Sequence, residues 1–331
     1  MEIIDRKKEE IVVSIVCTAY NHENYIEDAI KSFLMQETDF KFEILIHDDA
    51  STDNTANIIK KYEQKYPELV KPIYQKENQY SKGVRVIEIL YKKAKGKYIA
   101  SCEGDDYWID KYKLQKQIDY MEKHPKCTFC FTNAIKKFVK TNKEEVFIKK
   151  TRLNKKVFTL ENFNIGELAE FDFIPTASFM FPKKILNNMP NFYYIPLGAG
   201  DFRLKLACTY QGYAHFINET MVVYRRGVEN SVTTSWEKQN NEKNIEIFKN
   251  FIYVIDQINK ETGYVYQENL DKVRIEFEIG ILYLKCDKKL LENKRYLNYY
   301  KSLSLRNRIV SKLYLKHNKI YKFLKKIKDL I

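Results

Sequence analysis

The sequence predicts an α/β fold with a mainly parallel central sheet flanked by helices, followed by a helical C-terminal region. Strand-like apolar runs alternate with helical patterns over the first hundred residues, which is typical of βαβ units. The first run, residues 11–19, is continuously apolar and β-branched, as in a strand buried on both faces. Beyond Trp236 apolar residues recur at helical spacing. We therefore expect a domain over residues 1–235 and a helical region over 236–331.

The predicted elements of the first domain alternate along the chain. Asn24 and Glu27 have the spacing of a capping box, which predicts that a helix begins after Asn24. The other helices are expected from Ser51–Asp53 to Tyr66, over 84–94 with Val84, Ile87, Leu90 and Ala94 facing inward, over 110–123 and over 200–212. Strands are expected at 42–49, 70–75, 98–102, 127–133 and 174–181, with an extended segment or a strand pair at 214–226. The lysine-rich residues 136–156 are expected to form an exposed hairpin or loop.

The composition indicates a globular protein of the cytoplasm. Hydrophobic residues make up 44% and charged residues 31% of the chain, which excludes a disordered protein. No secretory leader and no apolar run of about 18 residues is found, so no membrane span is expected. The six cysteines are expected to be reduced thiols. Cys127 and Cys130 could form half of a zinc site, but core packing within a strand is favoured because no second pair follows.

The net charge of +13 does not by itself indicate nucleic-acid binding, because it is unevenly distributed. Residues 301–331 contain ten Lys or Arg and one acidic residue, Asp329, so this tail carries most of the charge. The rest of the chain is only mildly basic, and it contains no recognised nucleic-acid-binding motif. We therefore expect no nucleic-acid partner, although a basic nucleic-acid-binding protein stays open as an alternative function.

Two acidic clusters follow predicted strands. Asp48 and Asp49 end the second strand, and Glu103, Asp105 and Asp106 follow the fourth. Ligands bind at the carboxyl ends of the strands in open parallel sheets, and carboxylates that lie close together repel one another unless a cation neutralises them. Hard oxygen ligands in this arrangement suit Mg²⁺ or Mn²⁺. Helix caps and a turn are the alternative explanation, and spacing alone leaves both open.

Glycine positions exclude two familiar phosphate-binding loops. The first strand is followed by TAYNHENY, which contains neither G-x-G-x-x-G nor the P-loop pattern. A nucleotide bound here would therefore be held mainly through a metal ion and carboxylates.

Five segments resemble the family 2 nucleotide-diphospho-sugar glycosyltransferases, whose Rossmann-like fold is called GT-A. The segments are VSIVCTAYNHENYIEDAIKSFLMQ, EILIHDDASTDNT, GKYIASCEGDDYW, GDFRLKLACTYQG and MVVYRR. They occur in the family's order and spacing, and they cover residues 11 to about 235. Each segment is weak evidence alone, but the five together are specific.

The resemblance implies a nucleoside site at the ends of the first two strands. Thr18 and Tyr20 match positions that meet the nucleoside. Asp49, together with Asp48, matches the carboxylate that accepts a hydrogen bond from the base.

The acidic turn, residues 103–106, matches the family's D-x-D motif, with Glu103 in place of the first Asp. The resemblance implies that Asp105 binds Mn²⁺ or Mg²⁺ and that Glu103 lies nearer the ribose. Asp106 is also typical of the family. The longer Glu103 side chain makes the ribose contact a weaker inference than the metal contact.

The resemblance also assigns roles beyond the acidic turn. Asp201 matches the catalytic base; without the resemblance, it would be interpreted as a helix N-terminal charge. Arg225 and Arg226 match basic groups near the diphosphate, whereas Gly227 replaces the His that many members have. Trp108 could stack on a sugar ring or pack the acidic turn.

The function implied is inverting transfer of a sugar from a nucleotide-diphospho-sugar, with UDP expected, to a glycan or lipid-linked acceptor in surface polysaccharide biosynthesis. A nucleotidyltransferase that makes nucleotide sugars is the alternative from the same fold class, but its Gly-rich, Arg-containing loop is absent. A catalytically inactive relative is disfavoured because Asp105 and Asp201 are both present.

The C-terminal tail has the pattern of a basic amphipathic helix. Its apolar face comprises Leu313, Ile320, Leu324, Ile327 and Ile331, with lysines largely opposite. Such a helix binds an anionic membrane surface, which would place the enzyme at the inner face of the plasma membrane. The alternative is that the tail packs on the body or on a second subunit of a homodimer.

Overall fold

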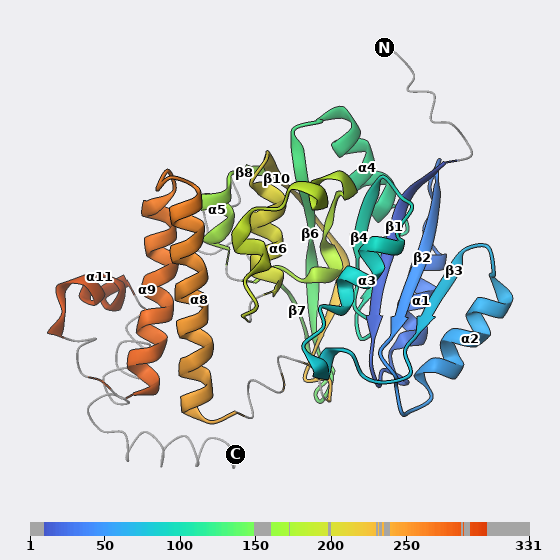
Figure 1. Cartoon of the computed structure of the whole chain (residues 1–331), viewed down its shortest axis with the longest axis horizontal. Coiled ribbons are helices and arrows are strands. Elements are labelled where there is room, and N and C mark those ends of the chain that lie inside the picture. The colour runs from blue at the N-terminus through green and yellow to red at the C-terminus, as the bar shows by residue number, and fades with distance from the viewer. Residues whose placement is uncertain are drawn as a thin grey trace.

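The computed structural model describes residues 10–148, 160–171, 173–197, 200–229, 231, 234, 239–285, 287 and 292–302 (Figure 1). The strands are β1 (Ile11–Ala19), β2 (Lys41–Asp48), β3 (Val70–Tyr74), β4 (Tyr98–Ser101), β5 (Tyr107–Trp108), β6 (Cys127–Phe138), β7 (Glu144–Val146), β8 (Asn162–Phe163), β9 (Met180–Pro182) and β10 (Tyr213–Arg226). The α-helices are α1 (Ile26–Leu34), α2 (Thr55–Lys65), α3 (Val86–Lys93), α4 (Lys113–Lys123), α5 (Ile165–Ala169), α6 (Gly200–Thr209), α8 (Asn241–Glu261), α9 (Gln267–Leu284) and α11 (Lys294–Ser302). Short 3₁₀ helices are η1 (Tyr80–Lys82), η2 (Thr176–Ser178), η3 (Lys183–Asn188) and η4 (Asn191–Tyr194).

One sheet forms the centre of the described structure, with the strand order β3-β2-β1-β4-β9-β6-β10-β5. The four strands β3, β2, β1 and β4 are mutually parallel, whereas β9 runs antiparallel to both β4 and β6. The long strands β6 and β10 are parallel to each other. The predicted α/β fold with a mainly parallel sheet is confirmed, and the parallel strands bring the ends of β1, β2 and β4 to one edge.

The start of α1 differs from the prediction. The helix begins at Ile26, and Asn24 provides no side-chain cap. The carbonyl of His22 instead accepts hydrogen bonds from the backbone N–H groups of Tyr25 and Ile26. Glu27 does not reach back to Asn24, because its carboxylate accepts a hydrogen bond from the Tyr62 hydroxyl (2.9 Å). Tertiary contact with α2 therefore replaces the capping box.

Two further expectations are corrected by the structure. Val84 precedes α3 and is 38% exposed rather than inward-facing. Residues 174–181 are not one strand: Ser178 and Phe179 donate backbone hydrogen bonds to Pro175 and Thr176, which forms the 3₁₀ turn η2 before β9. These turn bonds use the groups that a strand ladder would need.

The remaining elements agree closely with the sequence. Residues 214–226 form a single strand with register irregularities, so the strand-pair alternative is wrong and the extended segment is confirmed. The hairpin expected at 136–156 is present as β6 and β7 through residue 148, and residues 149–156 lie outside the described part of the chain. Cys127 and Cys130 are buried free thiols, and burial raises the pKa of Cys127 to about 12.

The C-terminal helices pack against the first domain. Figure 1 shows α8 and α9 at the opposite end of the molecule from α2. Val254 and Ile258 of α8 and Leu270 of α9 belong to the same buried cluster as Leu168 of α5 and Leu206 of α6. A helical region after residue 236 is thus confirmed for α8 and α9, whereas the boundary at 235 stays a prediction. The tail, residues 303–331, lies outside the described residues, and so do the predictions made for it.

Membrane crossing requires a long, apolar helix. Among the described residues, no helix meets both conditions.

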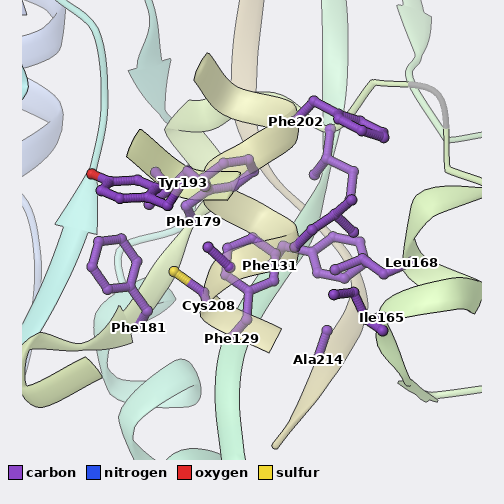
Figure 2. Packing of buried hydrophobic residues seen from close by; sticks show 14 of the residues in the cluster. Phe129, Phe131, Ile165, Leu168, Phe179, Phe181, Tyr193, Phe202, Cys208 and Ala214 are labelled. Carbon is purple, nitrogen blue, oxygen red and sulfur yellow. The ribbon is translucent and has the colours of Figure 1, made fainter. Parts of the chain in front are cut away.

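Phe131 is the centre of the larger core cluster (Figure 2). Its side chain is fully buried, and its ring lies 5.0 Å from that of Phe216, 5.6 Å from Phe171 and 5.8 Å from Phe129. This aromatic cluster lies beneath α6, whose first turn carries Asp201.

We predict that Phe131→Ala lowers the free energy of unfolding by about 3–5 kcal/mol, because the surrounding rings cannot close the cavity left behind. Urea denaturation followed by circular dichroism measures this loss. Phe138→Ala on the same strand, where the ring is only half-buried, serves as the matched control and should cost clearly less. Equal losses in the two variants would contradict the central position of Phe131.

Candidate active site

The acidic turn after β4 is pressed against the end of β1. The Gly104 N–H donates a hydrogen bond to the Thr18 carbonyl at 2.9 Å. A Cβ atom at Gly104 would lie 2.9 Å from both His22 Nδ1 and Ile26 Cδ1, a contact that real side chains do not make. Glycine is therefore required at this position for the turn to reach β1.

Arg225 fixes the turn from the opposite side. Its backbone N–H donates to Asp106 Oδ1 (2.8 Å), and its Nη1 donates to the Asp105 carbonyl (2.9 Å). The guanidinium also pairs with Asp28 of α1 and lies 4.4 Å from the ring centre of Tyr107. Arg225 is only 9% exposed. Arg225 therefore holds the acidic turn in this structure, and its place near a diphosphate stays a prediction.

Asp106 faces the interior of the protein, and Asp105 is partly exposed. Burial raises the pKa of Asp106 well above its usual value, and the nearby Asp105 and Glu103 add to this effect. The hydrogen bond from the Arg225 N–H opposes the shift. Asp106 therefore belongs to the support of the turn, whereas Asp105 is the member that a ligand can reach.

Asp201 is brought to the same place from a distant part of the sequence. It lies in the first turn of α6, and its charge is close enough to Glu103 to raise the pKa of that side chain. The Thr176 hydroxyl of η2 lowers the pKa of both Glu103 and Asp201, so it lies near both carboxyl groups. The 3₁₀ turn that breaks the expected strand thus places a hydroxyl group between the two carboxyl groups.

The electrostatics of this cluster follow from crowding. Burial, followed by the charges of Asp201 and Asp105, raises the pKa of Glu103 to about 8. Asp201 is open to solvent on one side, yet the surrounding protein desolvates its carboxyl group and raises its pKa. Hydrogen bonding to Thr176 and the charges of Lys205 and Arg203 limit that rise. The nearby cations therefore neutralise the carboxyl groups of the site only in part.

The two aspartates after β2 have different environments. Asp49 accepts backbone hydrogen bonds from Gln79 (2.8 Å) and Tyr80 (3.0 Å), one at each carboxylate oxygen, and so holds η1 in place. Asp48 accepts one hydrogen bond at Oδ2 from the Ser51 N–H (3.3 Å). Its Oδ1 is buried and has no hydrogen-bond partner among the described residues. Asp48 therefore has the acceptor that is free for a ligand.

Thr18 and Tyr20, at the end of β1, lie on the same edge of the sheet. Thr18 is paired with His47 in the register of β1 and β2, directly before Asp48. Tyr20 is 38% exposed, so its ring is accessible. The structure thus brings Thr18, Tyr20 and Asp48 together at the predicted nucleoside position.

Trp108 packs the turn and does not face a ligand. Its side chain is 1% exposed, its Nε1 donates to the Ala177 carbonyl (2.8 Å), and its ring meets Phe33 edge-on at 4.9 Å. Of the two interpretations of Trp108, sugar stacking is therefore wrong for this conformation and packing is confirmed. Arg226 is half-buried, and its carbonyl accepts a hydrogen bond from Val139; its role toward a diphosphate stays a prediction.

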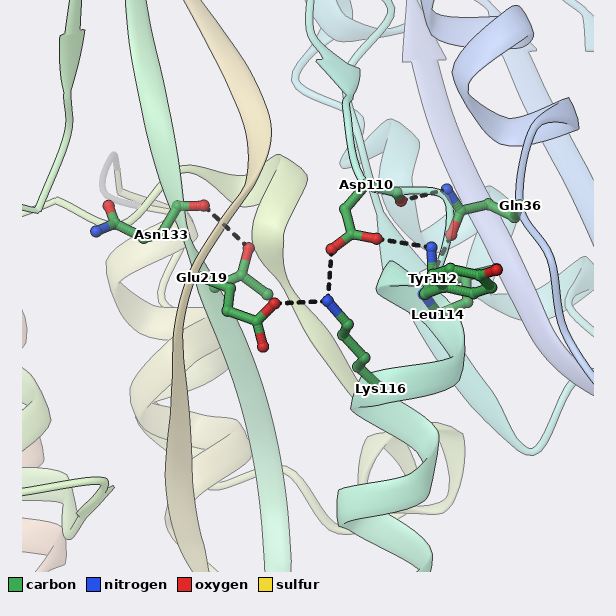
Figure 3. A network of polar contacts seen from close by, with 8 residues as sticks. Gln36, Asp110, Tyr112, Leu114, Lys116, Asn133 and Glu219 are labelled. Carbon is green, nitrogen blue, oxygen red and sulfur yellow. Dashed lines mark hydrogen bonds and ion pairs between the residues drawn. The ribbon is translucent and has the colours of Figure 1, made fainter.

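A polar network connects the segment after β5 to α1, α4 and β10 (Figure 3). Lys116 Nζ contacts Asp110 Oδ2 at 2.8 Å and Glu219 Oε2 at 2.5 Å. Gln36 Nε2 at the end of α1 donates to the Asp110 carbonyl (2.9 Å), and Gln36 Oε1 accepts from the Leu114 N–H (3.1 Å). These contacts fix the segment that leaves the turn.

Sequence reasoning missed Thr176, Arg203 and Asp28. Thr176 was interpreted as part of a strand, and no local pattern marks its position beside Asp201. Asp28 is an ordinary acidic residue in the first turn of a helix, and only the tertiary structure pairs it with Arg225.

We predict that Arg225→Lys lowers the free energy of unfolding by about 1–3 kcal/mol and weakens nucleotide binding, because a compact ammonium group lacks the two separate nitrogens with which the guanidinium reaches Asp28 and the Asp105 carbonyl. Denaturant titration and calorimetry with UDP measure the two effects. Weakened nucleotide binding with unchanged stability would instead indicate that Arg225 contacts the diphosphate directly.

The chain is similar in sequence to several known proteins. An uncharacterized protein of Mycobacterium tuberculosis is 34% identical over 232 residues, covering 68% of this chain and 63% of that protein. The Escherichia coli UDP-Glc:alpha-D-GlcNAc-diphosphoundecaprenol beta-1,3-glucosyltransferase WfaP is 38% identical over 123 residues, covering 37% of this chain and 45% of that protein. This chain therefore spans less than two thirds of the length of these relatives.

Solved structures show the same fold at low sequence identity. Staphylococcus aureus TarS 1–349 in complex with UDP-GlcNAc has a TM-score of 0.59 at 18% identity, covering 94% of this chain and 88% of TarS 1–349. The Pyrobaculum calidifontis mannosyltransferase PcManGT in complex with GDP-Man and Mn²⁺ has a TM-score of 0.53 at 15% identity, covering 97% of this chain and 88% of that one. The fold is thus the GT-A fold that the sequence predicted.

The family model described as Glycosyl transferase family 2 matches residues 14–186, a span that includes both acidic clusters. The chain belongs to glycosyltransferase family 2.

Proposed function

We propose that this chain is an inverting glycosyltransferase that moves a sugar from a UDP-sugar to a glycan or lipid-linked acceptor. The observation that carries the proposal is that Asp201 lies near Glu103 and Asp105, although it follows them by about a hundred residues in the sequence. The relatives' names support the substrate classes: WfaP is named for UDP-Glc and a diphosphoundecaprenol-linked acceptor.

Asp201 is proposed as the base. In a single displacement, the acceptor hydroxyl oxygen attacks the anomeric carbon while the bond to the nucleoside diphosphate breaks, and the carboxylate takes the hydroxyl proton. The configuration at the anomeric carbon is inverted. Burial raises the pKa of Asp201, which brings it closer to the working pH and makes it a better proton acceptor than a solvated aspartate. Thr176 orients the carboxyl group through its hydrogen bond.

Asp105 is proposed to bind Mg²⁺ or Mn²⁺ together with diphosphate oxygens. Among the described residues, no group of three or more His, Cys, Asp or Glu side chains is arranged to hold a metal ion. Proteins usually hold Mg²⁺ through one or two carboxylates plus substrate phosphates, so Asp105 and the diphosphate would hold it together. The crowding that raises the pKa of Glu103 indicates a site that would gain from a cation. When bound, the cation neutralises charge on the departing diphosphate.

Asp48 is proposed to recognise the base of the nucleotide. Its buried Oδ1 lacks a partner among the described residues and would accept a hydrogen bond from an N–H group such as that of a uracil ring. Thr18 and Tyr20 complete the nucleoside edge. Asp49 supports this site indirectly by holding η1.

The first prediction from this proposal concerns the cation. Binding of UDP, measured by calorimetry, should weaken about tenfold or more when Mn²⁺ is replaced by EDTA. Asp105→Asn should bind UDP equally weakly with and without Mn²⁺. Asp119→Asn on α4, a matched carboxylate change outside the site, should behave like the unaltered protein. UDP binding unaffected by EDTA would rule out Asp105 as a metal ligand.

The stability of the metal-free protein should also depend on pH. Because the pKa of Glu103 is raised to about 8 from its ordinary 4.5, the folded protein binds a proton that the unfolded chain releases. The stability that this proton contributes is complete below about pH 4.5 and is lost as the pH rises through 8. Melting temperatures without metal should therefore fall over this range, and the fall should be smaller with Mn²⁺ and in Glu103→Gln.

The second prediction concerns Asp201. Asp201→Asn keeps the size of the side chain but removes the proton acceptor, so transfer should fall by about 10²–10⁴-fold while UDP binding is retained. In the unaltered enzyme, transfer should decline as the pH falls through the raised pKa of Asp201. Transfer by the variant within a few fold of the original, or a product that retains the donor's anomeric configuration, would refute the mechanism.

A further inference from the structure

Arg203 on α6 is a buried cation with two nitrogens that have no hydrogen-bond partner among the described residues. It is 4% exposed, and its Nε and Nη1 atoms make no hydrogen bond within the part of the chain that the structure describes. Leaving a buried charge without compensating interactions is strongly destabilising. A bound anion would supply such an interaction for Arg203. Lys205, two residues further along the same helix, differs because it donates to the Phe171 carbonyl.

A second cation and a second unpartnered donor lie near Arg203. Arg85 stacks on the Tyr193 ring at 4.2 Å, donates to the Tyr193 carbonyl at 3.5 Å and pairs with Glu88 at 2.8 Å. The Tyr91 hydroxyl is buried and also lacks a hydrogen-bond partner among the described residues. Helix α6 packs against η4, which carries Tyr193.

The charges confirm that these groups are neighbours. Burial and, after it, the positive charge of Arg85 lower the pKa of Arg203 to about 10. Tyr91 is affected by Tyr193, Arg85 and Asp201, so it belongs to the same group. Two Arg203 nitrogens and the Tyr91 hydroxyl lack hydrogen-bond partners among the described residues, and Arg85 adds a second cation beside them, an arrangement that suits an anion.

The position of this group relative to the acidic turn is also fixed. Glu103 is affected by both Asp105 and Asp201, so it lies between them. Arg203 is affected by Asp201, and no member of the acidic turn is among the main influences on its pKa. Arg203 follows Asp201 by two residues on α6, so the cations lie beside the proposed base. Arg85, whose side chain is 32% exposed, forms the solvent-facing part of the group.

We propose that Arg203, Arg85 and the Tyr91 hydroxyl bind a phosphate group of the acceptor beside Asp201. Guanidinium groups bind phosphate through paired, charge-assisted hydrogen bonds, and a neighbouring hydroxyl supplies a further donor. Placing the acceptor phosphate here would hold the acceptor at the proposed base. The assignment to the acceptor rests on the proposed function, whereas the phosphate site itself does not.

The test uses inorganic phosphate as the probe and EDTA to remove cations from the acidic turn. Phosphate should raise the melting temperature of the unaltered protein, because a ligand that binds only the folded state stabilises it. Arg203→Met should weaken phosphate binding by about tenfold or more, and Tyr91→Phe should weaken it to a smaller extent. Asp105→Asn and the charge-matched surface variant Lys184→Met should bind phosphate normally.

Stability without phosphate separates a binding role from a structural one. Arg203→Met removes a buried, unpaired charge, so its melting temperature without phosphate should equal or exceed that of the unaltered protein. A marked drop in melting temperature, together with no phosphate effect in the unaltered protein, would show that Arg203 is a structural cation. Equal phosphate effects in the unaltered protein and Arg203→Met would place the anion elsewhere.

Saturating UDP with Mn²⁺ distinguishes the two sources of phosphate. If the site takes the acceptor phosphate, the stabilisation by phosphate persists when UDP is bound. Loss of the phosphate effect in the presence of UDP would assign Arg203 to the donor diphosphate and overturn the acceptor assignment. None of these measurements requires sugar transfer, so a failure of the proposed function and a failure of the phosphate site are observed separately.

Discussion

The structure depends on holding several carboxyl groups together at the end of β4, and the interaction that makes this feasible is the contact of Arg225 with the acidic turn. Like charges in a poorly solvated place repel strongly unless a fixed cation and directed hydrogen bonds offset the repulsion. Arg225 bonds Asp106, the Asp105 carbonyl and Asp28 from one buried position. Because β10 carries Arg225 into the sheet and α1 carries Asp28, the turn is fixed by elements nearly two hundred residues apart in the sequence.

Charge is distributed unequally around Asp201. The charge of Asp201 helps to raise the pKa of Glu103, whereas the charges of Lys205 and Arg203 lower the pKa of Asp201. Burial alone would drive Asp201 toward its neutral form, which cannot accept a proton. The cations of α6 oppose that shift, so the helix that presents the carboxyl group also maintains its charge.

Much of the fold was predictable, because parallel strands buried on both faces have continuous apolar runs. Such runs can be recognised in the sequence without knowing how the side chains pack. The identities of Asp105 and Asp201 followed from the resemblance to a family, since Asp201 alone has the pattern of an ordinary helix N-terminus. The function of Arg225 was not predictable: its partner Asp28 is set by tertiary structure, and the same residue type would serve a diphosphate equally well. The capping box predicted from Asn24 and Glu27 does not form: the helix begins at Ile26, and the Glu27 carboxylate accepts a hydrogen bond from Tyr62.

The C-terminal helices pack against the segments that position Asp201 and Arg203. Phe202, between these two residues, packs against Phe251 of α8 at 5.8 Å, and Phe251 stacks on Phe277 of α9 at 4.5 Å. The Glu261 carboxylate at the end of α8 accepts the backbone N–H groups of Asn191 (2.7 Å) and Phe192 (3.1 Å), which fixes the start of η4 and hence Tyr193 beneath Arg85. One pair of helices thus supports both the proposed base and the cations beside it. We therefore regard the helical region as a structural support for the proposed acceptor side of the site.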